Sequence, residues 1–121
     1  MGAPADAIRE FTQTLADVPV VAVASHVRDD LFELRRAFAS DDDFAAALRA
    51  VARRLRTLHV AGGEELDHDL AGWLRIKFSS TVVDRADLRI IFRKTSDGIE
   101  LRAFGHRHDP ESVYFRAARR S

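Results

Sequence analysis

Cationic side chains recur at alternating positions in the C-terminal half of the sequence. The set consists of Arg75, Lys77, Arg89, Arg93 and Arg102. Hydrophobic residues alternate with them, and the side chains of a strand point to its two faces in turn. We therefore expect five cations on one face of a small sheet, accompanied by a single acid, Glu100. Such an excess of one charge favours an anionic ligand, because the cations otherwise repel one another.

Groups able to move a proton follow this set closely. His106 and His108 carry imidazoles, which change protonation near neutral pH, and Tyr114 can stack on an unpaired base. RNA cleavage requires cations around the phosphate together with a proton donor and a proton acceptor. No metal is needed where the 2′-hydroxyl of the RNA is the nucleophile. The alternative is that Tyr114 is a core residue of the last helix and that both histidines face solvent.

The distribution of charge also points to an anionic partner. Residues 1–70 hold 8 Lys and Arg against 13 Asp and Glu, whereas residues 71–121 hold 11 against 6. This asymmetry suggests that the C-terminal part binds nucleic acid. The alternative is that the two halves neutralise each other across the domain. The side chains expected to bind the RNA strand are Arg93, Arg102, His108, Arg119 and Arg120.

Several classes of chemistry lack their residues. The absence of cysteine excludes thiol catalysis, cysteine-ligated zinc and iron–sulfur clusters. The segments His106-x-His108 and Asp67-His68-Asp69 could ligate a metal but lack a defined further ligand. No GxGxxG motif, P-loop or nucleophile elbow is present. We therefore expect no metal and no small-molecule cofactor.

The sequence also lacks membrane signals. No stretch approaches the roughly 20 apolar residues that a membrane span requires. Residues 18–24 end like a signal-peptidase site, but the basic and long apolar segments of a signal peptide are missing before them. We expect a cytoplasmic protein with no membrane partner.

Hydrophobic spacing predicts a helical first part. Helices are expected over residues 5–16, from an N-cap at Ser25, and from an N-cap at Ser40, with a strand candidate at residues 20–24. The stripes expected to be buried are Ile8, Phe11 and Leu15; Val27, Leu31, Leu34 and Phe38; and Phe44, Leu48, Val51, Leu55 and Leu58. The second and third helices are close enough in sequence to form an αα-hairpin.

The period changes from 3.6 to 2 after Trp73, which predicts a meander of three antiparallel strands. The side chains expected to face the helices are Leu74, Ile76 and Phe78; Leu88, Ile90 and Phe92; and Ile99, Leu101 and Ala103. Ser96-Asp97-Gly98 predicts a hairpin turn. A short helix is expected to carry Val113 and Tyr114 and to end at Arg119-Arg120. Helices followed by an antiparallel sheet indicate an α+β protein.

The stretch from Trp73 to Ser121 resembles the RelE/ParE toxin superfamily of bacterial toxin–antitoxin systems. The segments that carry the resemblance are Leu88-Arg89-Ile90-Ile91-Phe92, Ile99 to Gly105-His106-Arg107, and Ser112-Val113-Tyr114. The resemblance implies a RelE/ParE-like fold over residues 18–121: an N-terminal strand, an αα-hairpin, a three-stranded antiparallel meander and a short C-terminal helix. Residues 1–17 look like an added N-terminal helix.

The resemblance also implies roles for individual residues. Arg75, Lys77 and Arg89 match the cations with which RelE proteins stabilise the phosphate. Arg107 matches an arginine that assists the leaving 5′ oxygen, and Tyr114 matches the tyrosine that stacks on or orients the substrate. His106 takes the position of a lysine, and other branches use histidine for proton transfer, so His106 is the expected base because arginine is a poor one.

The RelE branch implies the toxin of a type II toxin–antitoxin system, an endoribonuclease that cleaves mRNA on the ribosome without metal. Its expected partners are a cognate antitoxin protein, mRNA and the ribosome. The alternative is a ParE-like gyrase inhibitor, or a catalytically inactive relative that only binds its antitoxin. A general RNA-binding module is less favoured, because the strands carry no aromatic pair of the kind that stacks on bases.

Overall fold

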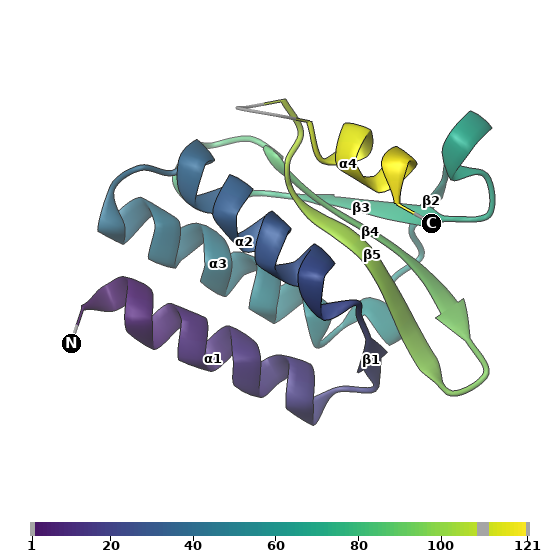
Figure 1. Cartoon of the computed structure of the whole chain (residues 1–121), viewed down its shortest axis with the longest axis horizontal. Helices are drawn as coiled ribbons and strands as arrows, with labels where there is room; N and C mark the ends of the chain where they lie inside the picture. Colours follow the sequence, from purple (N-terminus) through teal and green to yellow (C-terminus); the bar gives the residue numbers. More distant parts are fainter. Residues whose placement is uncertain (1, 109–111, 121) are drawn as a thin grey trace.

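A mixed sheet is the frame of the protein, with helices on both of its faces (Figure 1). The computed structural model describes residues 2–108 and 112–120, and over these residues the sheet has five strands in the order β1-β5-β4-β3-β2. The strands are β1 (Val20–Val21), β2 (Glu64–Glu65), β3 (Leu74–Phe78), β4 (Leu88–Thr95) and β5 (Gly98–His106). β1 runs parallel to β5, and the other pairs are antiparallel. The expected α+β class and the meander of three antiparallel strands are confirmed.

The helices are α1 (Ala3–Asp17), α2 (Ala24–Ala37), α3 (Asp41–Leu55) and α4 (Val113–Arg119), with short 3-10 turns η1 (Leu58–Val60) and η2 (His68–Leu70). The expected cap of α3 is confirmed, since the Ser40 hydroxyl accepts a hydrogen bond from the Asp43 amide at 3.1 Å. The expected cap at Ser25 is wrong: α2 begins at Ala24, and its N-cap is Val23. Over the described residues, no helix is long and apolar enough to cross a membrane.

The first helix belongs to the main hydrophobic core. α1 packs along α3 and buries Ala7, Phe11 and Thr14, whereas Ile8, expected on the buried stripe, is 40% exposed. The Phe11 ring lies 5.3 Å from the ring of Phe104 on β5. Residues 1–17 were expected as an extension, and their described part is a helix docked on the same core as the rest of the chain.

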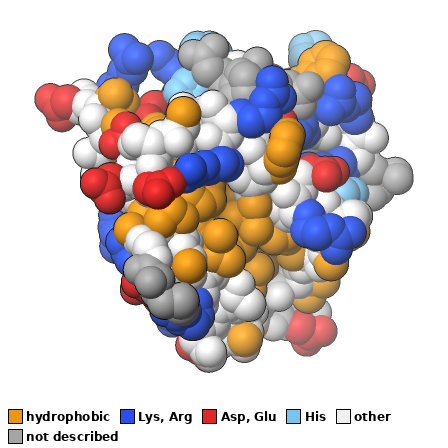
Figure 2. All heavy atoms as spheres, turned by 60° about the vertical axis from the view of Figure 1, so that its left-hand side comes forward, with side chains coloured by type: hydrophobic (Ala, Val, Ile, Leu, Met, Phe, Trp, Pro, Cys, Tyr) orange, Lys and Arg blue, Asp and Glu red, His pale blue; other side chains and the backbone are white. Residues whose placement is uncertain are grey.

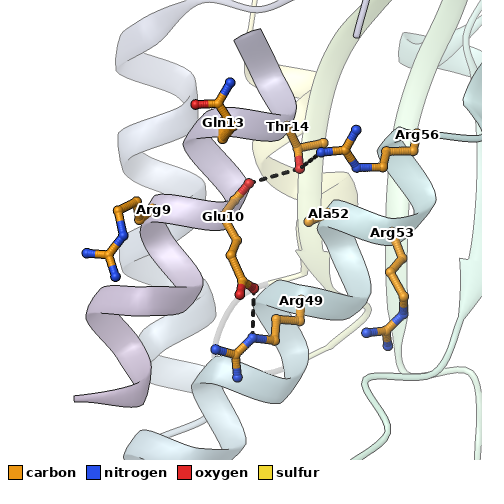
Figure 3. Close-up of a pocket in the computed structure, with 8 residues that line it drawn as sticks. All are labelled: Arg9, Glu10, Gln13, Thr14, Arg49, Ala52, Arg53 and Arg56. Atoms are coloured by element: carbon orange, nitrogen blue, oxygen red, sulfur yellow. Dashed lines mark hydrogen bonds and ion pairs between the residues drawn. The ribbon is translucent and has the colours of Figure 1, made fainter. Parts of the chain in front are cut away.

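Polar contacts also hold α1 against α3, and two of them are drawn in Figure 3. Arg49 donates its Nε hydrogen bond to Glu10 at 2.8 Å. Arg56, directly after α3, donates to the Thr14 hydroxyl at 3.1 Å, and that hydroxyl in turn donates to the Glu10 carbonyl. The contact between the two helices therefore combines buried small and aromatic residues with hydrogen bonds at its edge.

A β-bulge inverts the expected faces at the end of β5. Phe92 pairs with Leu101, but its neighbour Ile91 pairs with Ala103, so Arg102 is an extra residue in β5. Phe104 therefore faces the helical core and Ala103 faces the other side, the reverse of the expectation from unbroken alternation.

The second face of the sheet is covered and not open. α4 and η2 pack on it and form a smaller core of Leu70, Trp73, Ile91, Ala103, Val113 and Ala117. The expectation of an exposed cationic face is wrong here, because the period of the strands gives no indication that a short helix returns over them. α4 lies on the opposite side of the sheet from α1 and α3 (Figure 1).

One edge of β5 is completed by side chains instead of a strand. β1 pairs only with Ile99 and Glu100. Further along, the Phe104 amide donates to the buried carboxylate of Asp30 on α2 at 3.1 Å, and the Phe104 carbonyl accepts from Arg116 at 3.0 Å. The Arg102 carbonyl accepts from Arg120 at 3.0 Å. Buried backbone groups need such partners, since leaving them unpaired is expensive.

The same three side chains form a buried ion cluster. Asp30 is 1% exposed and accepts from Arg116 at 2.9 Å and from Arg120 at 2.8 Å. Arg116 lies in α4 and Arg120 directly after it. One carboxylate thus ties α2, β5 and the C-terminal helix together.

We expect Asp30→Asn to lower the free energy of unfolding by about 3 to 5 kcal/mol, because it removes the buried carboxylate that pairs with both Arg116 and Arg120. Urea denaturation followed by circular dichroism measures the change. The matched control is Asp29→Asn, an exposed neighbour, which should shift the value by no more than about 0.5 kcal/mol. Equal effects of the two variants would mean that the buried cluster contributes nothing particular to stability.

Candidate functional site

Tyr114 is the centre of a polar cluster on the face of the sheet that α4 covers. It lies in the first turn of α4, where the Ser112 hydroxyl accepts a hydrogen bond from its amide. Its phenolic oxygen accepts from Nη1 of Arg75 at 2.9 Å and from Nε of Arg89 at 3.0 Å. The structure thus brings together three of the residues expected at the site, from α4, β3 and β4.

Arg89 is held rigidly. It is 6% exposed, and its Nη1 also donates to the carbonyls of Ala86 at 2.7 Å and Leu88 at 2.9 Å. In the sheet it lies between Lys77 on β3 and Gly105 on β5. These bonds leave Arg89 little freedom, so its main effect is to fix the phenol of Tyr114.

Arg75 and Lys77 share one acid that the sequence analysis did not identify. Glu64 on β2 lies 3.5 Å from Nε of Arg75 and 3.7 Å from Nζ of Lys77. The Arg75 guanidinium, with Lys77 adding to it, lowers the pKa of Glu64, and the hydrogen bond to Tyr114 raises the pKa of Arg75. Among the described residues, the buried Nε of Arg75 makes no hydrogen bond, and its nearest partner is the Glu64 carboxylate of this ion pair.

Two of the expected RNA-binding cations have structural partners instead. The guanidinium groups of Arg93 and Arg102 lie over the Trp73 ring, at 4.4 and 4.9 Å from its centroid. Arg93 donates to Glu100 at 2.6 Å, and Arg102 donates to the Ala117 carbonyl at 2.9 Å. Burial lowers the pKa of Arg102, with neighbouring arginines contributing. These contacts fasten α4 to the sheet through cation–π and hydrogen-bond interactions.

His106 lies away from the Tyr114 cluster. Its ring is 6.1 Å from the ring of Phe38, the residue directly after α2, and it pairs across the sheet with Leu88, which belongs to the helical core. Unbroken alternation along β5 would have placed His106 on the same face as Tyr114, but the extra residue at Arg102 turns it to the other face. The structure therefore does not bring the expected base together with the phenol.

The remaining expected residues make separate contacts outside the Tyr114 cluster. The Arg107 amide donates to the Asp87 carbonyl at 3.0 Å, and the His108 amide donates to Nδ1 of His106 at 3.0 Å. Arg119 lies over the Phe115 ring at 4.5 Å. Arg120 belongs to the Asp30 cluster, where its guanidinium group is paired with the Asp30 carboxylate. Asp109 and Pro110, which follow in the sequence, lie outside the described residues.

A shallow depression of about 390 Å³ adjoins Tyr114. It is lined by Asp67, His68, Asp69, Leu70, Ser112, Tyr114, Phe115 and Ala118. His68 has a φ of +56°, which is uncommon for a residue with a side chain. Within residues 2–108 and 112–120, no group of three or more His, Asp or Glu residues could hold a metal ion.

The cluster can act on an anion. Because the phenolic oxygen accepts from two guanidinium groups, its own O–H proton points elsewhere and can be donated to a phosphate oxygen. Arg75 and Lys77 supply positive charge on the same side of the sheet.

The chain matches no protein-family model, no curated protein and no solved structure. The chemistry of the Tyr114 cluster is therefore inferred from its contacts and distances.

We expect Glu64→Gln to tighten the binding of a phosphate-bearing anion by about two- to fivefold, because it removes the carboxylate that competes with phosphate for Arg75 and Lys77. The lowered pKa keeps Glu64 charged from about pH 5 to pH 8, so the advantage of the variant should be constant over that range and disappear as the pH falls through the lowered value. Fluorescence anisotropy with a 2′-O-methyl RNA measures the affinity. Glu65→Gln, the exposed neighbour on β2, is the control and should change the affinity less than twofold.

Proposed function

We propose that the protein is the toxin of a toxin–antitoxin pair and an endoribonuclease that cleaves mRNA on the ribosome without metal. The observation that carries the proposal is the phenol of Tyr114 held by Arg75 and Arg89, with Lys77 beside them. The resemblance to the RelE branch assigns catalytic roles to these same positions. The order of a strand, two helices, three antiparallel strands and a short helix agrees with that resemblance.

The reaction that suits this cluster is attack of a 2′-hydroxyl on the adjacent phosphorus. The bond from the 2′ oxygen to phosphorus forms, the bond from phosphorus to the 5′ oxygen breaks, and the products are a 2′,3′-cyclic phosphate and a 5′-hydroxyl. The 2′-hydroxyl proton passes to water, and the leaving oxygen takes a proton from Tyr114. Arg75 and Lys77 stabilise the charge that develops on the phosphate. Arg89 is a positioning residue that acts through Tyr114.

An apolar groove supports a protein partner, which we propose to be the antitoxin. The groove has a volume of about 340 Å³ and is lined by Phe11, Thr12, Leu15, Val20, Ala22, Ala24, Val27, Arg28 and Leu31. Val21 on β1 and Phe32 on α2 are 70% and 65% exposed. Figure 2 shows hydrophobic side chains gathered in the middle of one face, with charged side chains around them. A surface of this kind is typical of a site that another protein covers.

We expect Tyr114→Phe and Arg75→Gln each to slow cleavage about a hundredfold, because each removes a donor to the phosphate or to the leaving oxygen. The measurement is primer-extension mapping of messages on translating ribosomes treated with the purified protein. His106→Gln is the matched control and should cleave like the unmodified protein, because His106 lies on the other face of the sheet.

The alternative functions give different results in the same assays. Growth arrest with gyrase-dependent DNA damage and intact messages would favour the gyrase inhibitor. Growth arrest that persists in a protein carrying Arg75→Gln, Arg89→Ala and Tyr114→Phe together would reject the catalytic assignment.

We also expect the cleavage products to show attack by the 2′-hydroxyl and not by a metal-bound water, because the proposed steps use only side chains and the 2′-hydroxyl. The products should carry a 2′,3′-cyclic phosphate and a free 5′-hydroxyl, which polynucleotide kinase labelling detects. A 5′-phosphate on the downstream product would indicate attack by water and would contradict the proposed reaction.

A further inference from the structure

Arginines on α3 and at its end have no part in the proposed reaction. Arg49 and Arg53 in α3 and Arg56 directly after it recur at spacings of four and three, so they lie along one side of the helix. Together with Arg9 of α1 they line a pocket of about 450 Å³ between the two helices. Glu10 is the only acid among the described residues that line this pocket. Ala52 also lines it, and its small side chain takes up little of the space.

We propose that this pocket is a phosphate-binding site. Guanidinium groups bind phosphate through paired, charge-assisted hydrogen bonds, and several of them around one opening suit a ligand with more than one negative charge. The site lies between α1 and α3, on the other side of the sheet from α4 and Tyr114. A ligand bound there is therefore not the phosphate that is cleaved.

The existing contacts of these arginines leave donors for a ligand. Arg9 donates to Asp6, and Arg49 uses its Nε for Glu10. Arg56 uses one terminal nitrogen for Thr14 and lies 3.6 Å from Asp17. Figure 3 shows Arg49 in the middle of α3 and Arg56 directly after its end reaching toward α1, with Arg9 and Arg53 at the two outer edges of the pocket. Within the described part of the chain, the side chain of Arg53 makes no hydrogen bond or ion pair.

The acid partners of these arginines are exposed, so phosphate can compete with them. Side-chain exposure is 37% for Arg49 and 56% for Glu10, and 49% for Arg56 and 46% for Asp17. Ion pairs that are this exposed are worth little. A ligand carrying two charges can therefore bind beside them or replace them without unfolding the contact between α1 and α3, which rests on buried Ala7 and Phe11.

Two sources can supply the phosphate: a free phosphorylated small molecule or the backbone of an RNA strand. Both offer the same charged oxygens, and the proposal is the same for either. Pyrophosphate and a 2′-O-methyl RNA of about 20 nucleotides are the two probes, because neither is cleaved by 2′-hydroxyl attack. Isothermal titration calorimetry of the full chain with each probe, at low and moderate salt, measures the affinity.

The chain offers a matched pair of variants for this test. Arg53 and Arg54 are adjacent and both exposed, but the Arg54 guanidinium lies over the Phe78 ring at 5.7 Å and does not line the pocket. We expect Arg53→Gln to weaken pyrophosphate binding about fivefold to tenfold and Arg54→Gln to change it less than twofold. Glu10→Gln should strengthen binding, which a merely structural role of Glu10 would not produce.

Comparison of the two probes shows whether the pocket binds a small molecule or an RNA backbone, and it also distinguishes this pocket from the catalytic site. Equal loss of pyrophosphate and RNA binding in Arg53→Gln supports the pocket as an RNA-backbone site, and loss of pyrophosphate binding alone supports a small-molecule site. Tyr114→Phe should leave pyrophosphate binding unchanged, so the result stands whether or not the protein cleaves RNA. Absence of saturable pyrophosphate binding, or equal effects of Arg53→Gln and Arg54→Gln, would overturn the proposal.

Discussion

The fold depends on the buried carboxylate of Asp30. Burying one acid and two arginines is favourable only when the charges are paired and their remaining hydrogen bonds are satisfied. Here Asp30 accepts from Arg116, from Arg120 and from the backbone of β5, and the arginines in turn satisfy two carbonyls of that strand. Tyr114 lies two residues before Arg116 on a helix of two turns, so the ion cluster also fixes the position of the phenol.

Much of the fold could be predicted from the sequence, because the relevant signals are local. The stripe and cap of α3 and the alternation of β3 and β4 fall within single elements, and the structure confirms them. The bulge at Arg102 could not be predicted, since one extra residue leaves no mark in a strand of only nine residues. The buried side of α1 depends on its approach to α3, where Ala7 fits against the partner helix and the larger Ile8 remains outside.

The candidate site divides in the same way. The alternation of β3 and β4 was enough to place Arg75 and Arg89 on one face of the sheet, whereas Tyr114 was joined to them only by the resemblance to RelE proteins. Glu64 was missed because a strand of two residues has no periodicity, although the preceding Gly62-Gly63 marks a change of structure. His106 was misplaced because its face depends on the bulge four residues earlier. The partners of Asp30 are 86 and 90 residues away from it, a separation that no sequence spacing reveals.

Trp73 is the only tryptophan of the chain, and it lies where α4 meets the sheet. Arg102, one of the two arginines over its ring, also bonds to the end of α4. The emission of this single indole therefore reports on one event, the seating of the C-terminal helix, and not on an average over the molecule. If α4 leaves the sheet while the helical core stays folded, the fluorescence will change and the far-ultraviolet circular dichroism will change little. The protein thus carries its own optical probe for the helix that holds Tyr114.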